Sequence, residues 1–149
     1  MTKSFPPKSL VLYADDDIDD QALLMEAFAK FSSVIEMVLF NNGAELLDFL
    51  NSLAPFQPQP CLVILDVNMP RLNGKQTLQT LRSMEQYKET PIVLFTTSTL
   101  PSEMAFAKAY DAGFITKPLH SRHIQLILDQ FIDHCEPGIK EKIRRVKGK

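Results

Sequence analysis

Three short apolar runs constrain the fold of this chain more than any other feature of its sequence. They are LVLYA (10–14), CLVILDV (61–67) and PIVLFTT (91–97). Each is apolar at successive positions rather than at alternate ones, as expected of a strand that is buried on both faces. Two weaker runs, IEMVLF (35–40) and FIT (114–116), complete a set of five strands. Strands of this kind need helices on both sides of their sheet.

The segments between these runs have the apolar spacing of amphipathic helices. Strands that alternate with helices predict an α/β fold with a parallel sheet covered on both faces. We expect the flavodoxin-like (βα)5 form, with strand order 2-1-3-4-5. The apolar stripes predict five helices: one with Leu23, Leu24, Ala27, Phe28 and Phe31, one with Leu46, Leu47, Leu50 and Leu53, a short one at Leu78 and Leu81, a small-sided one with Ala105, Ala109 and Ala112, and one from about Ser121 to Cys135.

The length of 149 residues suggests one domain with a sizeable core. We expect this domain at 10–136, after an N-terminal extension at 1–9, and we interpret the Pro-rich stretch at 54–60 as a connection inside it. Pro137-Gly138 is expected to end the last helix. A basic tail follows at 137–149, where six Lys and Arg residues accompany one Glu. Such tails are usually solvated, so nucleic acid is not an expected partner.

Composition excludes two broad classes of protein. The chain is 45% apolar and 23% charged, which is typical of a globular protein and not of a disordered one. Its apolar runs are well short of the ~20 residues that a membrane-spanning helix needs. Cys61 and Cys135 both lie on apolar segments, so we expect buried, reduced thiols in a cytoplasmic protein.

Polar side chains follow the predicted strands at the point where each one ends. In an open parallel sheet, ligands bind outside the carboxyl ends of the strands, at the position where the strand order reverses. In the expected order, the ends of the first and third strands are neighbours there, and the fourth and fifth strands approach from the other side. The side chains that this topology gathers are Asp15, Asp16 and Asp17, then Asp66 and Asn68, then Thr96, Thr97 and Ser98, and finally Lys117.

The chemistry of this set points to a metal ion and a phosphoryl group. Carboxylates that lie together repel one another unless a cation joins them, and oxygen ligands suit Mg²⁺ or Mn²⁺. A phosphoryl group beside the cation would use the Lys117 ammonium and the Thr96 hydroxyl. Aspartate is the nucleophile of aspartyl-phosphate chemistry. Asp66, at the centre of the set, is therefore the candidate acceptor.

Four motifs, LVLYADDD, LVILDVNMPRLNG, IVLFTTS and ITKPL, resemble in this order the receiver domain of two-component response regulators, above all its stand-alone, chemotaxis-type members. The resemblance covers residues 10–135. It implies that Asp66 accepts a phosphoryl group from a sensor histidine kinase or a histidine phosphotransfer protein. It also implies Mg²⁺ held by the side chains of Asp16 and Asp66 and by the Asn68 carbonyl, with Asp15 acting through water.

The same resemblance implies roles for the last two strands. Thr96 and Lys117 would bind the phosphoryl group, and the Lys117–Pro118 bond would be cis. Thr96 and Phe114 would form the switch, and a downstream protein would bind the face made by the fourth helix, fifth strand and fifth helix. Because no output domain follows in the sequence, we expect the signal to leave by protein contact, of which a phosphorylation-dependent homodimer is one form. Such a domain is a switch and not an enzyme, apart from its own phosphotransfer and autodephosphorylation.

The chain also departs from the family pattern. It has AGF (112–114) where receivers usually read like GANGY, which affects the output face. The family assigns no role to Asp17, Asp19 and Asp20. We expect Asp19 or Asp20 to cap the first helix, where a negative charge suits the helix dipole.

Three other readings of the acids remain open at this point. An EF-hand would place Asp15, Asp17, Asp19 and Glu26 at ligand positions, but Asp20 stands where its loop needs Gly. An aspartyl-phosphate phosphatase or phosphotransferase would usually carry a second acid at position 68, where this chain has Asn. A degenerate receiver would bind a protein partner without being phosphorylated.

Overall fold

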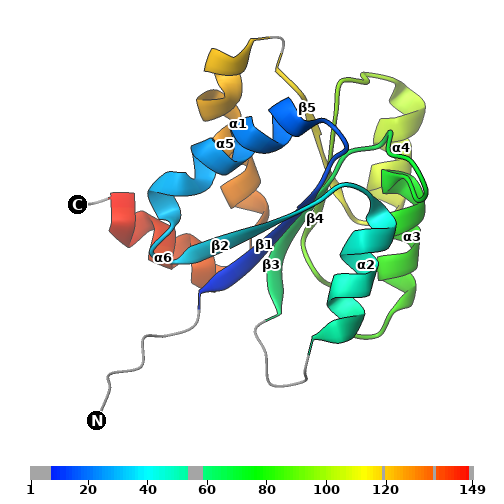
Figure 1. Ribbon diagram of the computed structural model, residues 1–149, viewed down its shortest axis with the longest axis horizontal. Coiled ribbons are helices and arrows are strands. Elements are labelled where there is room, and N and C mark those ends of the chain that lie inside the picture. Colours follow the sequence, from blue (N-terminus) through cyan, green and yellow to red (C-terminus); the bar gives the residue numbers. More distant parts are fainter. Residues whose placement is uncertain (1–7, 54–58, 119, 136, 148–149) are drawn as a thin grey trace.

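The centre of the computed structural model, which describes residues 8–53, 59–118, 120–135 and 137–147, is a sheet of five parallel strands (Figure 1). Their order is β2-β1-β3-β4-β5, as the sequence predicts. The expected extension at 1–9 and the Pro-rich connection at 54–60 lie mostly outside the described residues. The strands are β1 (Ser9–Ala14), β2 (Ile35–Phe40), β3 (Pro60–Leu65), β4 (Ile92–Thr96) and β5 (Gly113–Thr116).

The three strong apolar runs form the middle of this sheet, where a strand is covered on both faces. β3 and β4 are buried along their whole length, and β1 is buried at all residues after Ser9. Ala14 of β1 pairs with Phe40 of β2 on one side and with Leu65 of β3 on the other. These strands therefore end at one level, and the residues that follow Ala14 and Leu65 are neighbours.

Helices cover both faces of the sheet (Figure 1). Adjacent residues of β1 belong to different cores, since Tyr13 lies in the cluster on the α1, α5 and α6 side and Leu12 in the cluster on the α2, α3 and α4 side. Both cysteines are buried in the first of these clusters, as expected. The helices are α1 (Ile18–Phe28), α2 (Gly43–Ser52), α3 (Gly74–Ser83), α4 (Pro101–Ala109), α5 (Ile124–His134) and α6 (Pro137–Lys147), with 3-10 turns at Ala29–Phe31 and Ser121–His123.

The basic segment after α5 is not the solvated tail that its charge suggests. The break after Cys135 is confirmed, but Pro137 begins α6 instead of ending the ordered chain, because proline is well suited to the first turn of a helix. Ile139 and Ile143 of α6 are each 2% exposed and belong to the core. They are spaced as a helical stripe, a signal that the surrounding lysines and arginines obscured.

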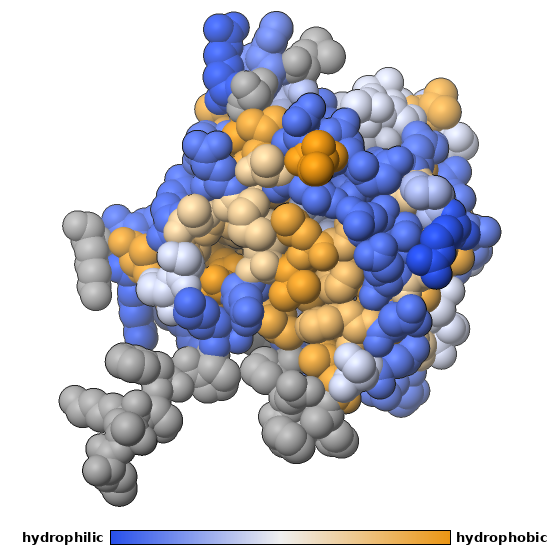
Figure 2. Space-filling model, viewed as in Figure 1, coloured by the Kyte–Doolittle hydropathy of each residue, from blue (hydrophilic) through white to orange (hydrophobic). Residues whose placement is uncertain are grey.

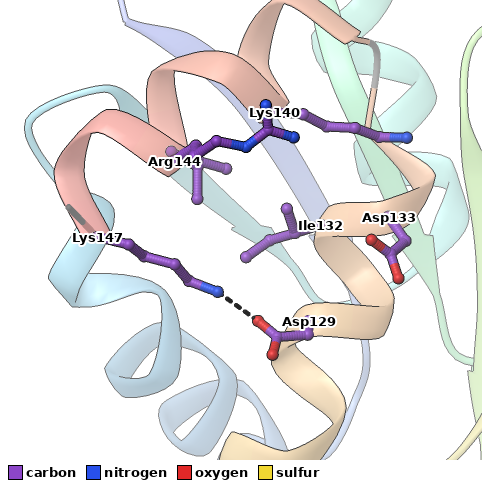
Figure 3. A pocket seen from close by; sticks show the side chains of 7 residues that line it. Asp129, Ile132, Asp133, Lys140, Arg144 and Lys147 are labelled. Carbon is purple, nitrogen blue, oxygen red and sulfur yellow. Dashed lines mark hydrogen bonds and ion pairs between the residues drawn. The ribbon is translucent and has the colours of Figure 1, made fainter.

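A cleft lies between α5 and α6, with Ile132 and charged side chains from both helices along it (Figure 3). Lys147 Nζ crosses this cleft and lies 2.6 Å from Asp129 Oδ1. The pair is exposed on both sides, so we expect it to contribute little stability beside the buried isoleucines.

The helix α4 buries a different face from the one that its alanines suggest. Ala105 and Ala109 are exposed, whereas Glu103 and Ala107 are buried and Phe106 packs against the core. An aromatic side chain removes more apolar area from water than a row of alanines does. The predicted stripe is therefore wrong at Ala105 and Ala109, whereas Ala112, which follows α4, packs against the core as expected.

The edge strand β2 gives the sheet a partly apolar border. Figure 2 shows apolar side chains gathered over β2 and α2, where Met37, Val38 and Leu39 are half-buried. Among the helices of the described ranges, none is long and apolar enough to cross a membrane.

Candidate functional site

Three carboxylates lie together beyond the carboxyl ends of β1 and β3. Asp66 N–H donates to the Ala14 carbonyl at 2.9 Å, which holds the two strand ends side by side. Asp15 is fully buried, Asp66 is 7% exposed and Asp16 is exposed. Each of the three offers a carboxylate oxygen, and these oxygens lie within 4.8 Å of one another. The structure thus brings together the acids that the sequence analysis selected.

Lys117 reaches this cluster from the end of β5. Its backbone N–H donates to the Thr96 carbonyl at 2.7 Å, which fixes the start of the side chain beside β4. Its Nζ lies 2.7 Å from Asp15 Oδ2, 2.7 Å from Asp20 Oδ2 and 3.5 Å from Asp66 Oδ1. The lysine side chain is 8% exposed, so these charges interact with little screening by water.

Every polar atom of the Asp15 side chain has a protein donor. Its Oδ2 accepts from the Tyr13 hydroxyl at 2.5 Å and from Lys117 Nζ, and its Oδ1 accepts from Asp17 N–H at 2.9 Å. Gln21 Nε2 donates to the Asp15 carbonyl at 2.6 Å. This carboxylate is therefore held in one orientation, as a buried charge requires.

Tyr13 and Gln21 are the contributors that sequence reasoning missed. Tyr13 stands two residues before Asp15 on a strand, so both side chains point to the same face, and a buried hydroxyl needs a partner. That spacing was the available signal. Gln21 carried no comparable signal, because its contacts depend on how α1 docks against β1 and β2.

Asp17, and not Asp19 or Asp20, caps α1. Asp17 Oδ1 accepts from the N–H groups of Asp19 at 2.9 Å and Asp20 at 3.2 Å. Asp17 has the extended backbone of a cap residue, whereas the other two acids already lie in the first helical turn. Asp19 and Asp20 lie where a negative charge interacts favourably with the dipole of α1, as expected. Asp20 also pairs with Lys117.

This helix start also removes the calcium-loop alternative. An EF-hand needs a twelve-residue loop that runs through Glu26. Here α1 begins at Ile18 and includes Glu26, so only three residues separate it from β1. The apolar stripe predicted a helix here and the spacing of the acids predicted a calcium loop, and the structure has the helix.

The close packing of the acids shifts their proton equilibria. Burial first, and then the charge of Asp15, raise the pKa of Asp66 from its ordinary 3.8 to about 7, although Lys117 opposes the shift. Burial disfavours the charge on Lys117, but its hydrogen bonds to Asp15 and Asp20 and the charges of Asp15 and Asp66 raise its pKa overall. Burial also raises the pKa of Tyr13, with Asp15 adding to the effect. The tyrosine therefore stays a neutral donor.

The loop after Asp66 is shaped by a close backbone contact. A Cβ on Gly74 would lie 2.1 Å from the Asp66 carbonyl oxygen, so this position has no room for a side chain. Asn73 caps α3, and its side chain and that of Gln76 form a capping box. Asn68 is part of this loop, two residues after Asp66, and its side chain is exposed.

The two switch candidates lie on neighbouring strands. Thr96 ends β4, is 1% exposed, and its Oγ1 accepts from Ser98 N–H at 3.2 Å. Phe114 of β5 is partly buried against the α2, α3 and α4 side of the core. The described residues contain no cis peptide bond, so the expected cis form of Lys117–Pro118 is wrong. The trans form is the intrinsically favoured one, and it allows Lys117 to reach the acids.

The family model for the response regulator receiver domain matches residues 11–129. Among curated proteins, the chain is 29% identical over 98 residues to the response regulator Rcp1 of Synechocystis sp., a match that covers 64% of this chain and 66% of Rcp1. It is 27% identical over 113 residues to the chemotaxis protein CheV2 of Helicobacter pylori, covering 74% of this chain and 34% of CheV2. The matched regions thus span less than two thirds of these relatives.

Three solved structures with the same fold superpose well on this chain. The phosphorylated cyanobacterial phytochrome response regulator RcpA superposes with a TM-score of 0.79 at 21% identity, covering 89% of this chain and 96% of RcpA. The Vibrio cholerae chemotaxis protein CheY4 gives a TM-score of 0.68 at 27% identity, covering 84% of this chain and 99% of CheY4. The Mn²⁺-bound form of Rcp1 gives a TM-score of 0.71 at 23% identity, covering 81% of this chain and 91% of Rcp1.

Proposed function

Because this chain belongs to the family of response regulator receiver domains, we propose that it is a phosphoacceptor switch and that Asp66 is the acceptor. The observation that carries the proposal is the position of Lys117, whose ammonium group lies within 3.5 Å of Asp66 in a buried acidic cluster. A lysine at this place is suited to the charge of a phosphoryl group on Asp66.

In the proposed reaction, an Asp66 carboxylate oxygen attacks the phosphorus of a phosphohistidine. The new O–P bond forms as the P–N bond breaks, and the imidazole nitrogen keeps the electron pair and takes up a proton. Lys117 and the Thr96 hydroxyl bind phosphoryl oxygens. Attack of water on the phosphorus of the acyl phosphate then breaks the O–P bond, releases inorganic phosphate and restores the Asp66 carboxylate.

The acids fit a divalent cation. Asp15, Asp16 and Asp66 supply hard oxygen ligands. Burial, and then repulsion from Asp15, raise the pKa of Asp66, and a cation would stabilise its ionised form against both effects. We propose Asp16, Asp66 and the Asn68 carbonyl as direct ligands, with Asp15 acting through water. When bound, Mg²⁺, or Mn²⁺ in its place, neutralises charge on a phosphoryl oxygen.

The proposed partners are a sensor histidine kinase or a histidine phosphotransfer protein, and a downstream protein that binds α4, β5 and α5. Thr96 and Phe114 would couple the acceptor to this face by a shift between two conformations. A second copy of this chain could bind the same face, which would give a phosphorylation-dependent homodimer. Since phosphohistidine is made with ATP, we propose a cytoplasmic location.

Incubation with acetyl phosphate and Mg²⁺ tests the proposal, with intact-protein mass spectrometry as the readout. We expect the mass of one phosphoryl group on the wild type and on Asp48→Asn, which makes the same chemical change at an exposed position of α2. We expect none on Asp66→Asn, and none with excess EDTA. Label on Asp66→Asn would refute the site. Absence of label on the wild type would favour a phosphorylation-independent binding module, and rapid turnover of a small phosphoester would favour a hydrolase.

A further inference from the structure

Asp20 is a charged contact of the site to which neither the acceptor chemistry nor the helix cap assigns a role. Its Oδ2 lies 2.7 Å from Lys117 Nζ, as close as Asp15 and closer than Asp66 at 3.5 Å. The metal-competent group consists of Asp15, Asp16 and Asp66, without Asp20. Asp20 therefore pairs with the lysine and not with the site at which a cation would bind.

The position of Asp20 is fixed by the helix that carries it. Its N–H is held by the Asp17 cap, and the next residue, Gln21, binds the carbonyls of Asp15 at 2.6 Å and Phe40 at 3.2 Å. The first turn of α1 is thus tied to the ends of β1 and β2. Lys117 is tied in the same way to β4 through its backbone. The pair joins two anchored elements across the site.

Resting on the proposed function, we propose that Asp20 retains Lys117 in the unphosphorylated chain and competes with the phosphoryl group for it. An ammonium group has three donors, which Asp15, Asp20 and Asp66 already face. A phosphoryl group on Asp66 brings further negative charge and acceptor oxygens close to the same Nζ. Asp20 is the more exposed of the two close partners, at 29% against 0% for Asp15, so it is the one that water can replace.

Two effects of Asp20 act in the same direction. Its ion pair with Lys117 stabilises the unphosphorylated form, and its negative charge repels a phosphoryl dianion. Removal of the charge should therefore favour the phosphorylated form. A role in preparing Lys117 for the reaction would have the opposite sign, because the loss of a positioning contact weakens binding.

The test compares Asp20→Asn with Asp19→Asn, which removes the same charge from the same helical turn. In the described part of the chain, Lys117 pairs with Asp15, Asp20 and Asp66 but not with Asp19, whose side chain is exposed. The probe is beryllofluoride with saturating Mg²⁺, a stable mimic of the phosphoryl group, and its bound fraction is read by fluorine NMR. Mg²⁺ affinity without beryllofluoride is measured by calorimetry on the same proteins.

We expect Asp20→Asn to bind beryllofluoride about two- to fivefold more tightly than the wild type, in keeping with an ion pair that water reaches only from the Asp20 side. Asp19→Asn should stay within about 1.5-fold, and Mg²⁺ affinity should change by less than about twofold in both. Equal or weaker beryllofluoride binding by Asp20→Asn overturns the proposal, as does an equal gain in Asp19→Asn or a tenfold loss of Mg²⁺ affinity. Wild type that neither binds beryllofluoride nor accepts phosphate would overturn the proposed function as well, so the two failures are distinguishable.

Discussion

The raised pKa of Asp66 makes a direct prediction about the stability of the metal-free chain. Asp66 is 7% exposed, and its pKa is raised from 3.8 to about 7 by burial and by the neighbouring acids. Between these two pH values the unfolded chain has lost the proton, whereas the folded chain keeps it. The free energy of unfolding therefore falls as pH rises through this window. Asp66→Asn, which has no proton to lose at this position, lacks that slope.

The size of the effect follows from the two pKa values. One pKa unit corresponds to about 1.36 kcal/mol. Between about pH 4.5 and about pH 7.5, the folded and unfolded forms of Asp66 diverge by about 2 units, or about 3 kcal/mol. We therefore expect Asp66→Asn to gain about 2 to 3 kcal/mol relative to wild type as pH rises across this range.

Urea denaturation in EDTA, followed by circular dichroism at several pH values, measures this difference. Asp48→Asn, at an exposed position of α2, is the matched control, and it should differ from the wild type by less than about 0.5 kcal/mol at every pH. Mg²⁺ in place of EDTA should remove most of the wild-type slope, because a cation stabilises the ionised carboxylate.

A difference between Asp66→Asn and wild type that stays constant, or shrinks, as pH rises would refute the reasoning. It would mean that Lys117 compensates the Asp66 charge fully, so that burial and Asp15 do not hold the acceptor protonated. A slope that Mg²⁺ leaves unchanged would contradict the assignment of Asp66 as a metal ligand.

Three further substitutions test how the site and the core are built. Tyr13→Phe should lower the free energy of unfolding by about 1 to 3 kcal/mol in urea denaturation, because the buried Asp15 carboxylate loses a hydroxyl donor; an unchanged value would contradict the role of this bond. Gly74→Ala should lower it by about 1 to 3 kcal/mol and reduce acetyl phosphate labelling, since the new Cβ would lie 2.1 Å from the Asp66 carbonyl oxygen; full labelling would show that the loop can move. Ile143→Ala should lower the unfolding free energy by about 2 to 5 kcal/mol, because this residue of α6 is 2% exposed. A loss below about 0.5 kcal/mol would mean that α6 is not part of the core.

Sequence reasoning was most successful where a signal lies within a few consecutive residues. The run CLVILD at 61–66 shows both that the strand is buried on two faces and that a carboxylate ends it. Alternation of such runs with helical stripes is enough to predict a parallel sheet, because a parallel connection needs a crossover of this kind. The predicted strand order alone places Asp15, Asp66 and Lys117 at one edge of the sheet.

Sequence reasoning was least successful where several residues could take the same place, as the buried face of a helix or as its cap. For α4, spacing favoured the alanine face, yet Phe106 packs inward because it buries more area. For α6, the many charged residues predicted a solvated segment, yet two isoleucines of this helix pack in the core. Asp20 is a similar case, since the sequence favoured Asp19 or Asp20 as the cap of α1, whereas the cap geometry assigns that role to Asp17.

The chain alone therefore determines the α/β class, the strand order and the set of acids, because apolar periodicity and strand ends are local properties of the sequence. Packing in three dimensions determines the contacts of each acid: Asp15 with Tyr13 and Lys117, and Lys117 with Asp20 across 97 residues of sequence. Those contacts depend on where a helix docks against the sheet and which atoms it then excludes from water. No stretch of sequence a few residues long contains that information.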